Sequence, residues 1–200
     1  MLKVYYSKFI DLLDAVLFEP FRLESALSES EPRFLKLITS VLLFLAALSA
    51  SVAFVIVCPP YTKRSIGLLG TGFLGHLAFF SLLPYPLAFM LDGLAQRKDR
   101  KSNSKVMFLL VKISMVVFLS AGAWAILFTQ FGLSGILGIA VLYLIHYGLF
   151  ILVSIRGTMY LYDLKFKDAL SFNLSTFLIS LFFPLAMYFA LASSFGPALQ

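Results

Sequence analysis

The two histidines of this sequence, His76 and His146, are the residues best suited to chemistry, because each falls within a long uncharged stretch. His76 lies 11 residues after Ser65, about 16 Å along a helix, and His146 lies 10 residues before Arg156, about 15 Å. Both would then sit near the middle of a bilayer, where an ionisable side chain is a candidate functional site. The pair could form a proton relay or half of a metal site. In the alternative, each neutral imidazole bonds a serine, a tyrosine or a backbone carbonyl across a helix bundle.

Catalysis needs further reactive groups, and the sequence places none beside the histidines. All ten acidic residues lie at or outside the ends of the uncharged stretches. Two histidines are fewer ligands than zinc requires. Gly70, Gly72 and Gly75 match the G-x-G-x-x-G fingerprint, but that motif binds a dinucleotide only between a strand and a helix. We therefore expect no enzymatic activity, no metal and no cofactor.

Three further residues interrupt the apolar stretches. Lys112 lies about 9 Å inside the edge of its stretch, and we expect it to snorkel toward the interface. A buried ion pair with Asp92 or Asp163 is the alternative. Pro84 and Pro86 remove two backbone donors and predict a kinked helix. Such a kink serves either as a hinge beside a transport cavity or as a static bend in a bundle.

Small residues recur at a spacing of four in two of the apolar stretches. In lipid, a small-xxx-small row lets two helices approach closely. We therefore expect Gly67, Thr71 and Gly75, and the shorter row of Ser134 and Gly138, to lie at helix or subunit contacts.

The composition indicates whether these stretches fold in water or in a lipid bilayer. The chain has 200 residues, of which 60% are hydrophobic and 13% charged, and its mean hydropathy is +0.94. An ordinary soluble chain is about 45–50% apolar and about 25% charged. A compact soluble enzyme and a disordered chain are thereby excluded, and the lone cysteine, Cys58, excludes a disulfide scaffold.

The uncharged stretches divide into helices of the length that a bilayer requires, about 20 residues. One stretch of 43 residues, from Ile113 to Ile155, is too long for one helix and carries turn residues from Thr129 to Gly135. Dividing it there predicts an all-α polytopic bundle of five transmembrane helices. The predicted spans are 34–57, 66–91, 106–128, 133–155 and 171–194.

The basic residues predict the orientation of the bundle, because positively charged loops stay in the cytoplasm. Fourteen of the sixteen lysines and arginines fall on one predicted face, and only Lys63 and Arg64 fall on the other. This places the N-terminus in the cytoplasm and the C-terminus outside. The membrane would be the cytoplasmic one in a bacterium and an early secretory one in a eukaryote. The charge of +6 is spread in short strings between apolar runs, so we expect no nucleic-acid partner.

The first 33 residues predict a separate cytoplasmic segment that precedes the transmembrane domain, 34–200. Apolar and polar residues alternate here with helical periodicity, which is typical of an amphipathic helix on the membrane surface. The apolar face consists of Tyr5, Phe9, Leu12, Leu13, Val16 and Leu17, and the polar face of Ser7, Lys8, Asp11 and Asp14. Pro20 either ends or kinks this helix. Ser28 and Glu31 form a capping box, followed by Pro32, that starts the first span.

Two segments of this layout resemble the Yip family of five-span proteins, which are named for interaction with Rab-type GTPases. The segment LLDAVLFEPFRLESAL is similar to the amphipathic lead of prokaryotic members. The segment GTMYLYDLKFKDALSFNLSTFLISLFFPL is similar to their last loop and final helix, whose proline is Pro184 here. The resemblance implies a cytoplasmic N-terminal region, five closely spaced helices and a short tail across the membrane. The D-L-x-G-P element of the eukaryotic branch is missing from this sequence.

Two functions are compatible with these features. In the first, the chain is a non-enzymatic membrane scaffold, recruiter or organiser that binds proteins at its cytoplasmic face and packs against lipid or a second copy of itself. In the second, it is a small permease or channel that uses the kinked second span and the two histidines.

Overall fold

The computed structural model describes residues 2–28, 30–57 and 65–182, and every regular element in these ranges is a helix. This confirms the all-α class. The elements are α1 (Leu2–Leu17), η1 (Pro20–Arg22), α2 (Leu23–Ser28), α3 (Pro32–Val57), α4 (Ser65–Leu82), α5 (Pro84–Gln96), α6 (Ser104–Ser114), η2 (Met115–Ser120), α7 (Ala121–Gln130), α8 (Gly135–Leu161) and α9 (Phe166–Ser180).

Four helical segments are long and apolar enough to cross a membrane, as an integral membrane protein requires. They are Pro32–Val57, Gly67–Gln96, Ser104–Gln130 and Gly135–Leu161. They extend past several predicted ends because a helix can continue from hydrocarbon into the polar boundary. Of the predicted fifth span, α9 forms the first half, while residues 183–194 with Pro184 lie outside the described residues. The count of five and the orientation stay predictions.

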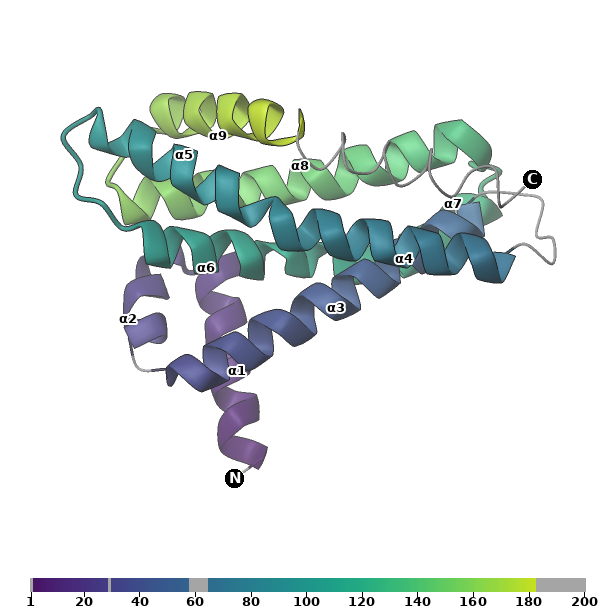
Figure 1. The fold of residues 1–200 in the computed structure, drawn as a ribbon, viewed down its shortest axis with the longest axis horizontal. Coiled ribbons are helices and arrows are strands. Elements are labelled where there is room, and N and C mark those ends of the chain that lie inside the picture. Colours follow the sequence, from purple (N-terminus) through teal and green to yellow (C-terminus); the bar gives the residue numbers. More distant parts are fainter. Residues whose placement is uncertain (1, 29, 58–64, 183–200) are drawn as a thin grey trace.

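The four segments run along the long axis of the molecule, and α1 crosses one end of them (Figure 1). The loops that follow α5 and α8 lie at that same end. At the other end α7 and α8 reverse direction within a few residues, at the predicted turn. Gly132 and Gly135 adopt positive φ angles there, 74° and 67°, which glycine accommodates at little cost. Cys58, Lys63 and Arg64 lie outside the described residues.

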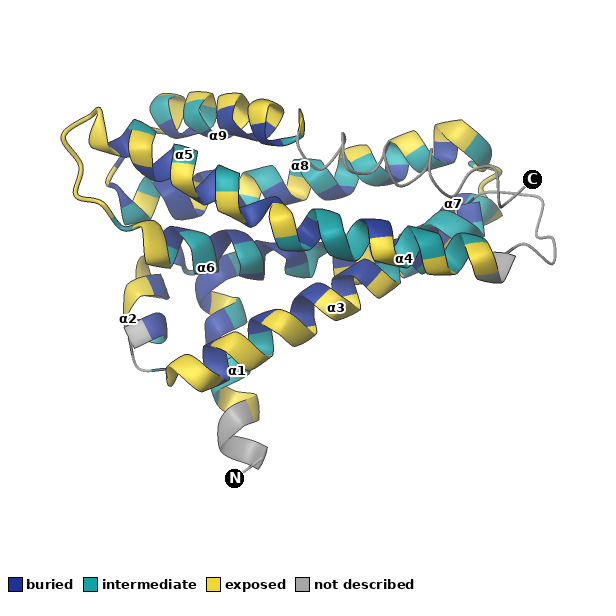
Figure 2. Ribbon diagram, in the orientation of Figure 1, coloured by how far each residue is buried: buried dark blue, intermediate teal, exposed yellow. Residues whose placement is uncertain are grey.

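The burial pattern matches a lipid environment. Figure 2 shows buried residues on the faces that helices turn to one another, and exposed residues on the outer faces. Many of the outer residues are large and apolar, such as Ile136, Leu144 and Phe89, which are 88%, 75% and 79% exposed. Water disfavours such extensive apolar surface, whereas hydrocarbon does not.

The helix α3 packs at the centre through a face of small residues. This face contacts α4, α7 and η2. Its smallest buried residues are Ala46, Ala47, Ala50, Ser51 and Ala53, each at most 1% exposed. Small side chains let helix backbones approach closely where van der Waals contact, rather than exclusion of water, favours association.

The N-terminal helices pack against the bundle and share its apolar core. Leu12, Ala15 and Val16 of α1 are 1–2% exposed, whereas Asp11 and Asp14 are exposed. In the described part of α1, these buried and exposed residues therefore lie on different faces of the helix, and the amphipathic membrane helix stays a prediction.

An arginine from the fourth long helix fixes the end of α1. The guanidinium of Arg156 donates hydrogen bonds of 2.9 Å to the carbonyl oxygens of Leu17 and Phe18. These bonds satisfy acceptors that the last turn of a helix leaves open, and they place a positive charge at its negative end. The predicted capping bond involves the side chain of Ser28, which the structure does not describe. The helix α3 begins at Pro32.

The predicted small-residue rows have different surroundings. Gly75 and Gly138 are buried, Thr71 is half-buried, and Gly67 and Ser134 are exposed. A β-carbon built at Gly138 would lie 2.6 Å from both the carbonyl oxygen of Leu133 and Cγ1 of Val57.

Sequence reasoning missed one equally tight contact, at Gly157. A β-carbon there would overlap the side chain of Leu110 on α6. Gly157 belongs to no small-xxx-small row with another glycine, so its role depends on where α6 passes.

We predict that Gly138→Ala destabilises the protein by about 1–2 kcal/mol. The methyl group would have to displace a backbone carbonyl, and overpacking costs more than the gain in helix propensity. Gly148→Ala, also within α8, is the matched control because a β-carbon there meets nothing within 4 Å. Thermal unfolding in detergent micelles measures both. Equal midpoints for the two variants would contradict the close approach at Gly138.

Candidate functional site

His76 lies on α4 with both ring nitrogens hydrogen-bonded. Its Nδ1 lies 2.7 Å from the carbonyl oxygen of Gly72 and 3.0 Å from Oγ of Ser51, while its Nε2 bonds the hydroxyl of Tyr143. Because a carbonyl oxygen only accepts, Nδ1 carries the proton. Nε2 then accepts the proton of the tyrosine hydroxyl. This arrangement fits a neutral imidazole with internal partners.

His146 lies on α8, fully buried, and repeats the same pattern. Its Nδ1 donates to the carbonyl oxygen of Leu142, one turn earlier, at 2.7 Å. Its Nε2 lies 3.2 Å from Oγ of Ser120 on η2. Each histidine is thus anchored to its own helix through Nδ1 and to a neighbouring helix through Nε2.

Aromatic rings lie between the two histidines. Phe80 packs against His76 with ring centroids 6.0 Å apart, Phe118 packs against Phe80 at 4.6 Å, and His146 packs against Phe118 at 5.6 Å. No hydrogen bond joins the two imidazoles among the described residues. In the same part of the chain, no group of three histidine, cysteine or acidic side chains could hold a metal. The structure brings the histidines into one aromatic cluster but not into contact.

Phe118 of this aromatic cluster lies in an irregular segment of the third long helix. The sequence does not indicate this irregularity. Residues of η2 form a 3₁₀ helix between α6 and α7. Ser49 of α3 donates to the carbonyl oxygen of Leu119 at 2.9 Å and accepts from the N–H of Gly122 at 3.2 Å. A side chain inserted in this way compensates for the interrupted backbone ladder.

The second long helix is also interrupted, directly before its prolines. The α-helical pattern stops after Leu82 and resumes at Pro84, and Pro84 is buried while Tyr85 is exposed. This is where Pro84 and Pro86 predict a kink. Whether the kink moves as a hinge stays a prediction.

Lys112 forms neither of the predicted ion pairs. Its Nζ lies 4.5 Å from the ring centroid of Phe108 and 5.9 Å from that of Tyr85. Asp92 and Asp163 both bond other groups. The lysine is therefore held over aromatic faces rather than by a carboxylate.

Asp92, near the end of α5, accepts four hydrogen bonds, a role that the sequence does not indicate. Its carboxylate, 5% exposed, accepts bonds of 2.7 Å from Gln96 Nε2, from Ser102 Oγ and from the backbone N–H of Asn103, and one of 2.6 Å from the hydroxyl of Tyr162. Burial raises the pKa of Tyr162, and its bond to Asp92 raises that pKa further. The carboxylate therefore ties α5, the following loop and the end of α8 together.

Further contacts join this loop to its neighbours. Asn103 donates to Glu24 of α2 at 2.7 Å, and Lys98 lies 3.4 Å from Asp168 of α9. Arg100 bonds both the backbone and the carboxylate of Asp163, at 2.7 and 3.3 Å. We call this end of the molecule, formed by residues 6–27, 96–105 and 162–168, the basic end.

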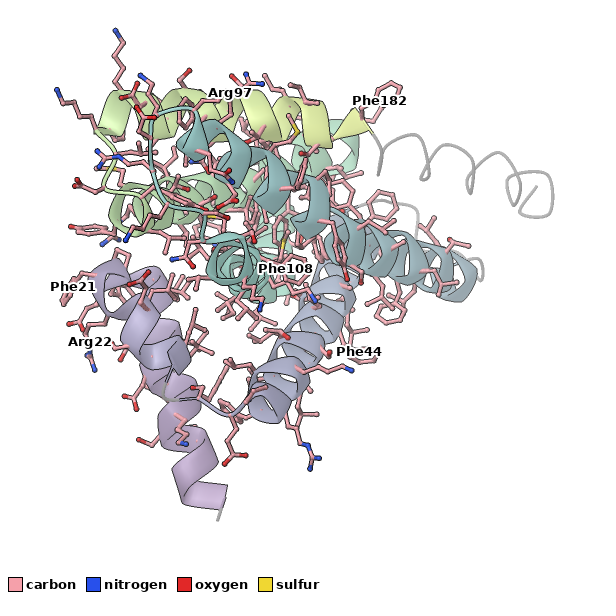
Figure 3. All side chains as sticks on the ribbon, turned by 60° about the vertical axis from the view of Figure 1, so that its left-hand side comes forward. Phe21, Arg22, Phe44, Arg97, Phe108 and Phe182 are labelled. Atoms are coloured by element: carbon pink, nitrogen blue, oxygen red, sulfur yellow. The ribbon has the colours of Figure 1, made fainter. Side chains whose placement is uncertain are left out.

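A cleft of about 560 Å³ opens between α1 and the start of α3. Phe9, Phe34 and Ile38 are among the apolar residues that line it, and Glu31 and Arg33 supply its charged groups. Figure 3 shows Phe21 and Arg22 projecting outward from the neighbouring N-terminal helices.

Comparisons of the chain with protein-family models, curated proteins and solved structures find no match. The resemblance to the Yip family therefore rests on the two sequence segments and the layout alone.

We predict that Asp92→Asn destabilises the protein by about 2–3 kcal/mol. An amide has one acceptor oxygen, so two of the four bonds are lost, and the remaining two lose their charge at the junction of α5 and α8. Asp99→Asn is the matched control, because Asp99 is exposed and its φ of 58° suits asparagine equally well. Thermal unfolding in micelles gives both values. Indistinguishable unfolding midpoints would show that the Asp92 carboxylate does not hold α5, the following loop and the end of α8 together.

Proposed function

We propose that this chain is a non-enzymatic integral membrane protein that organises or recruits partners at its basic end. The proposal follows the function that the Yip-like resemblance implies. It treats the basic end as cytoplasmic, as the distribution of lysine and arginine predicts.

The observation that carries this proposal is the bonding between segments of the basic end that are far apart in sequence. Arg156 holds the end of α1, Asn103 bonds Glu24 of α2, and Arg100 bonds Asp163 after α8. Pre-organised segments bind a partner without a large loss of conformational entropy. A persistent face of this kind suits recruitment better than free loops would.

The charge of this face indicates the chemistry of its partner. Five cations on it are exposed and have no carboxylate within 4.0 Å among the described residues. They are Arg97, Lys101, Lys105, Lys165 and Lys167. Complementary potentials steer association and select partners. An acidic protein surface is complementary to this group of five cations, whereas α1 adds the exposed carboxylates of Asp11 and Asp14 to the basic end.

A small permease or channel is the second candidate. The two interrupted helices favour it, because 3₁₀ segments and proline kinks often mark hinges. The bonded histidines and the aromatic rings between them favour static packing instead. We retain the scaffold as the main proposal for this reason.

We expect neutralisation of the basic end to weaken partner capture. Lys101→Gln with Lys167→Gln removes two exposed charges, worth together about 1 kcal/mol, or about fivefold in affinity. Cross-linking of the full-length protein in its native membrane, followed by mass spectrometry, measures the recovered partners. Gln130→Glu with Ser134→Glu changes the net charge equally at the opposite end. Equal partner recovery from the two double variants would count against the proposal.

We expect proteoliposomes containing the wild-type protein to hold an imposed pH gradient as long as protein-free vesicles do. The reason is that each imidazole already has internal partners and rings separate the pair. A pH-sensitive dye inside the vesicles provides the measurement. Dissipation that disappears in the His76→Ala, His146→Ala double variant would favour the channel over the scaffold.

A further inference from the structure

Lys112 carries a charge inside an apolar helix without a carboxylate to balance it. Among the described residues, no carboxylate oxygen lies within 4.0 Å of its Nζ, whereas the ring centroids of Phe108 and Tyr85 lie at 4.5 and 5.9 Å. The two rings are themselves 4.7 Å apart. A cation–π contact offsets part of the cost of removing an ammonium group from water. It does not neutralise the charge.

The ammonium group reaches toward the end of its helix. Phe108 precedes Lys112 by one turn, and a helical side chain leans toward the N-terminus. With the Nζ over Phe108, the charge lies about 6 Å inside the start of α6 at Ser104. A bilayer carries a polar layer of about 5–7 Å on each side of its hydrocarbon core. The ammonium is thus within reach of the phosphate layer.

The surface around this charge is apolar at depth and basic at its edge. Tyr85 and Phe89, one turn apart on α5, are 58% and 79% exposed. Lys105 is exposed and shares a face of α6 with Phe108 and Lys112, because the three are spaced three and then four residues apart. Phe108 is half-buried and packs beside Tyr85 of α5 (Figure 3).

We infer that this surface, formed by Lys105, Phe108 and Lys112 of α6 with Tyr85 and Phe89 of α5, is a binding site for one anionic phospholipid. The phosphate accepts a charge-assisted hydrogen bond from Nζ of Lys112. Lys105 faces the rest of the headgroup, and an acyl chain lies along Tyr85 and Phe89. An anionic lipid offers a negative charge to the lysines and an apolar chain to the exposed rings. An acidic protein segment would have to enter the hydrocarbon to reach Lys112. Lys105 also belongs to the exposed cations of the basic end. The site does not require the proposed recruitment function, because Lys112, Tyr85 and Phe89 lie outside that face.

The test measures how strongly the full-length protein retains phosphatidylglycerol relative to phosphatidylcholine. The protein is reconstituted with an equimolar mixture of the two lipids, and native mass spectrometry counts the lipids that stay bound. We expect the wild type to retain one phosphatidylglycerol with about tenfold preference, the size of one charge-assisted bond. Lys112→Met should lose this preference, and Lys112→Arg should keep it.

The controls separate this site from general attraction by the basic end. Lys101→Met removes an exposed loop charge and should leave the preference unchanged. Lys105→Gln should lower the preference for phosphatidylglycerol about threefold. It should not disturb the fold, because Lys105 is exposed. Thermal unfolding in phosphatidylcholine confirms that Lys112→Met is folded. Wild-type retention by Lys112→Met, or displacement of the lipid by millimolar inorganic phosphate, would overturn the inference.

Discussion

A helix in hydrocarbon must satisfy its polar groups within the protein, because no water is there to bond them. The irregular segments of this chain obey that constraint. Where the third long helix changes to a 3₁₀ helix, the hydroxyl of Ser49 bonds the backbone of both Leu119 and Gly122. The bonds of Ser49 thus give this irregular segment one additional donor and one additional acceptor from a neighbouring helix. The same segment carries Phe118 and Ser120, which contact the ring of His146.

The same constraint explains why polar side chains in the bundle occur in bonded sets. Asn173 of α9 accepts a 2.5 Å bond from Ser154 and donates to Thr158, both on α8. His76 and His146 each use a carbonyl of their own helix and a hydroxyl from another. Such bonds fix the rotation of each helix relative to its neighbour, which apolar packing in lipid specifies poorly. They therefore act first as structural contacts, and any transport role would have to break them.

The sequence predicted features that depend on one segment at a time. Apolar length indicated the long helices, and the glycines near residue 132 indicated the turn between α7 and α8. Gly138 was found because its row is visible in the sequence. Asp92, Ser49 and Gly157 were missed because their partners are distant: Tyr162 is 70 residues from Asp92, and Leu119 is 70 residues from Ser49. Nothing local distinguishes these residues from exposed or neutral ones, so only the packing of helices reveals them.

The partners of the charged side chains change with their depth in the molecule. At the basic end, arginine and aspartate side chains bond loops and helix ends, where water also reaches them. Asp92 and Arg156 lie within spans but near their ends, and backbone or side-chain groups bond each of them. Lys112 lies eight residues inside its span, deeper than the other charges in the described spans, and only rings face it. On the inference above, an anionic lipid supplies the balancing charge. In that case the bilayer would satisfy a polar group of this chain as well as cover its apolar surface.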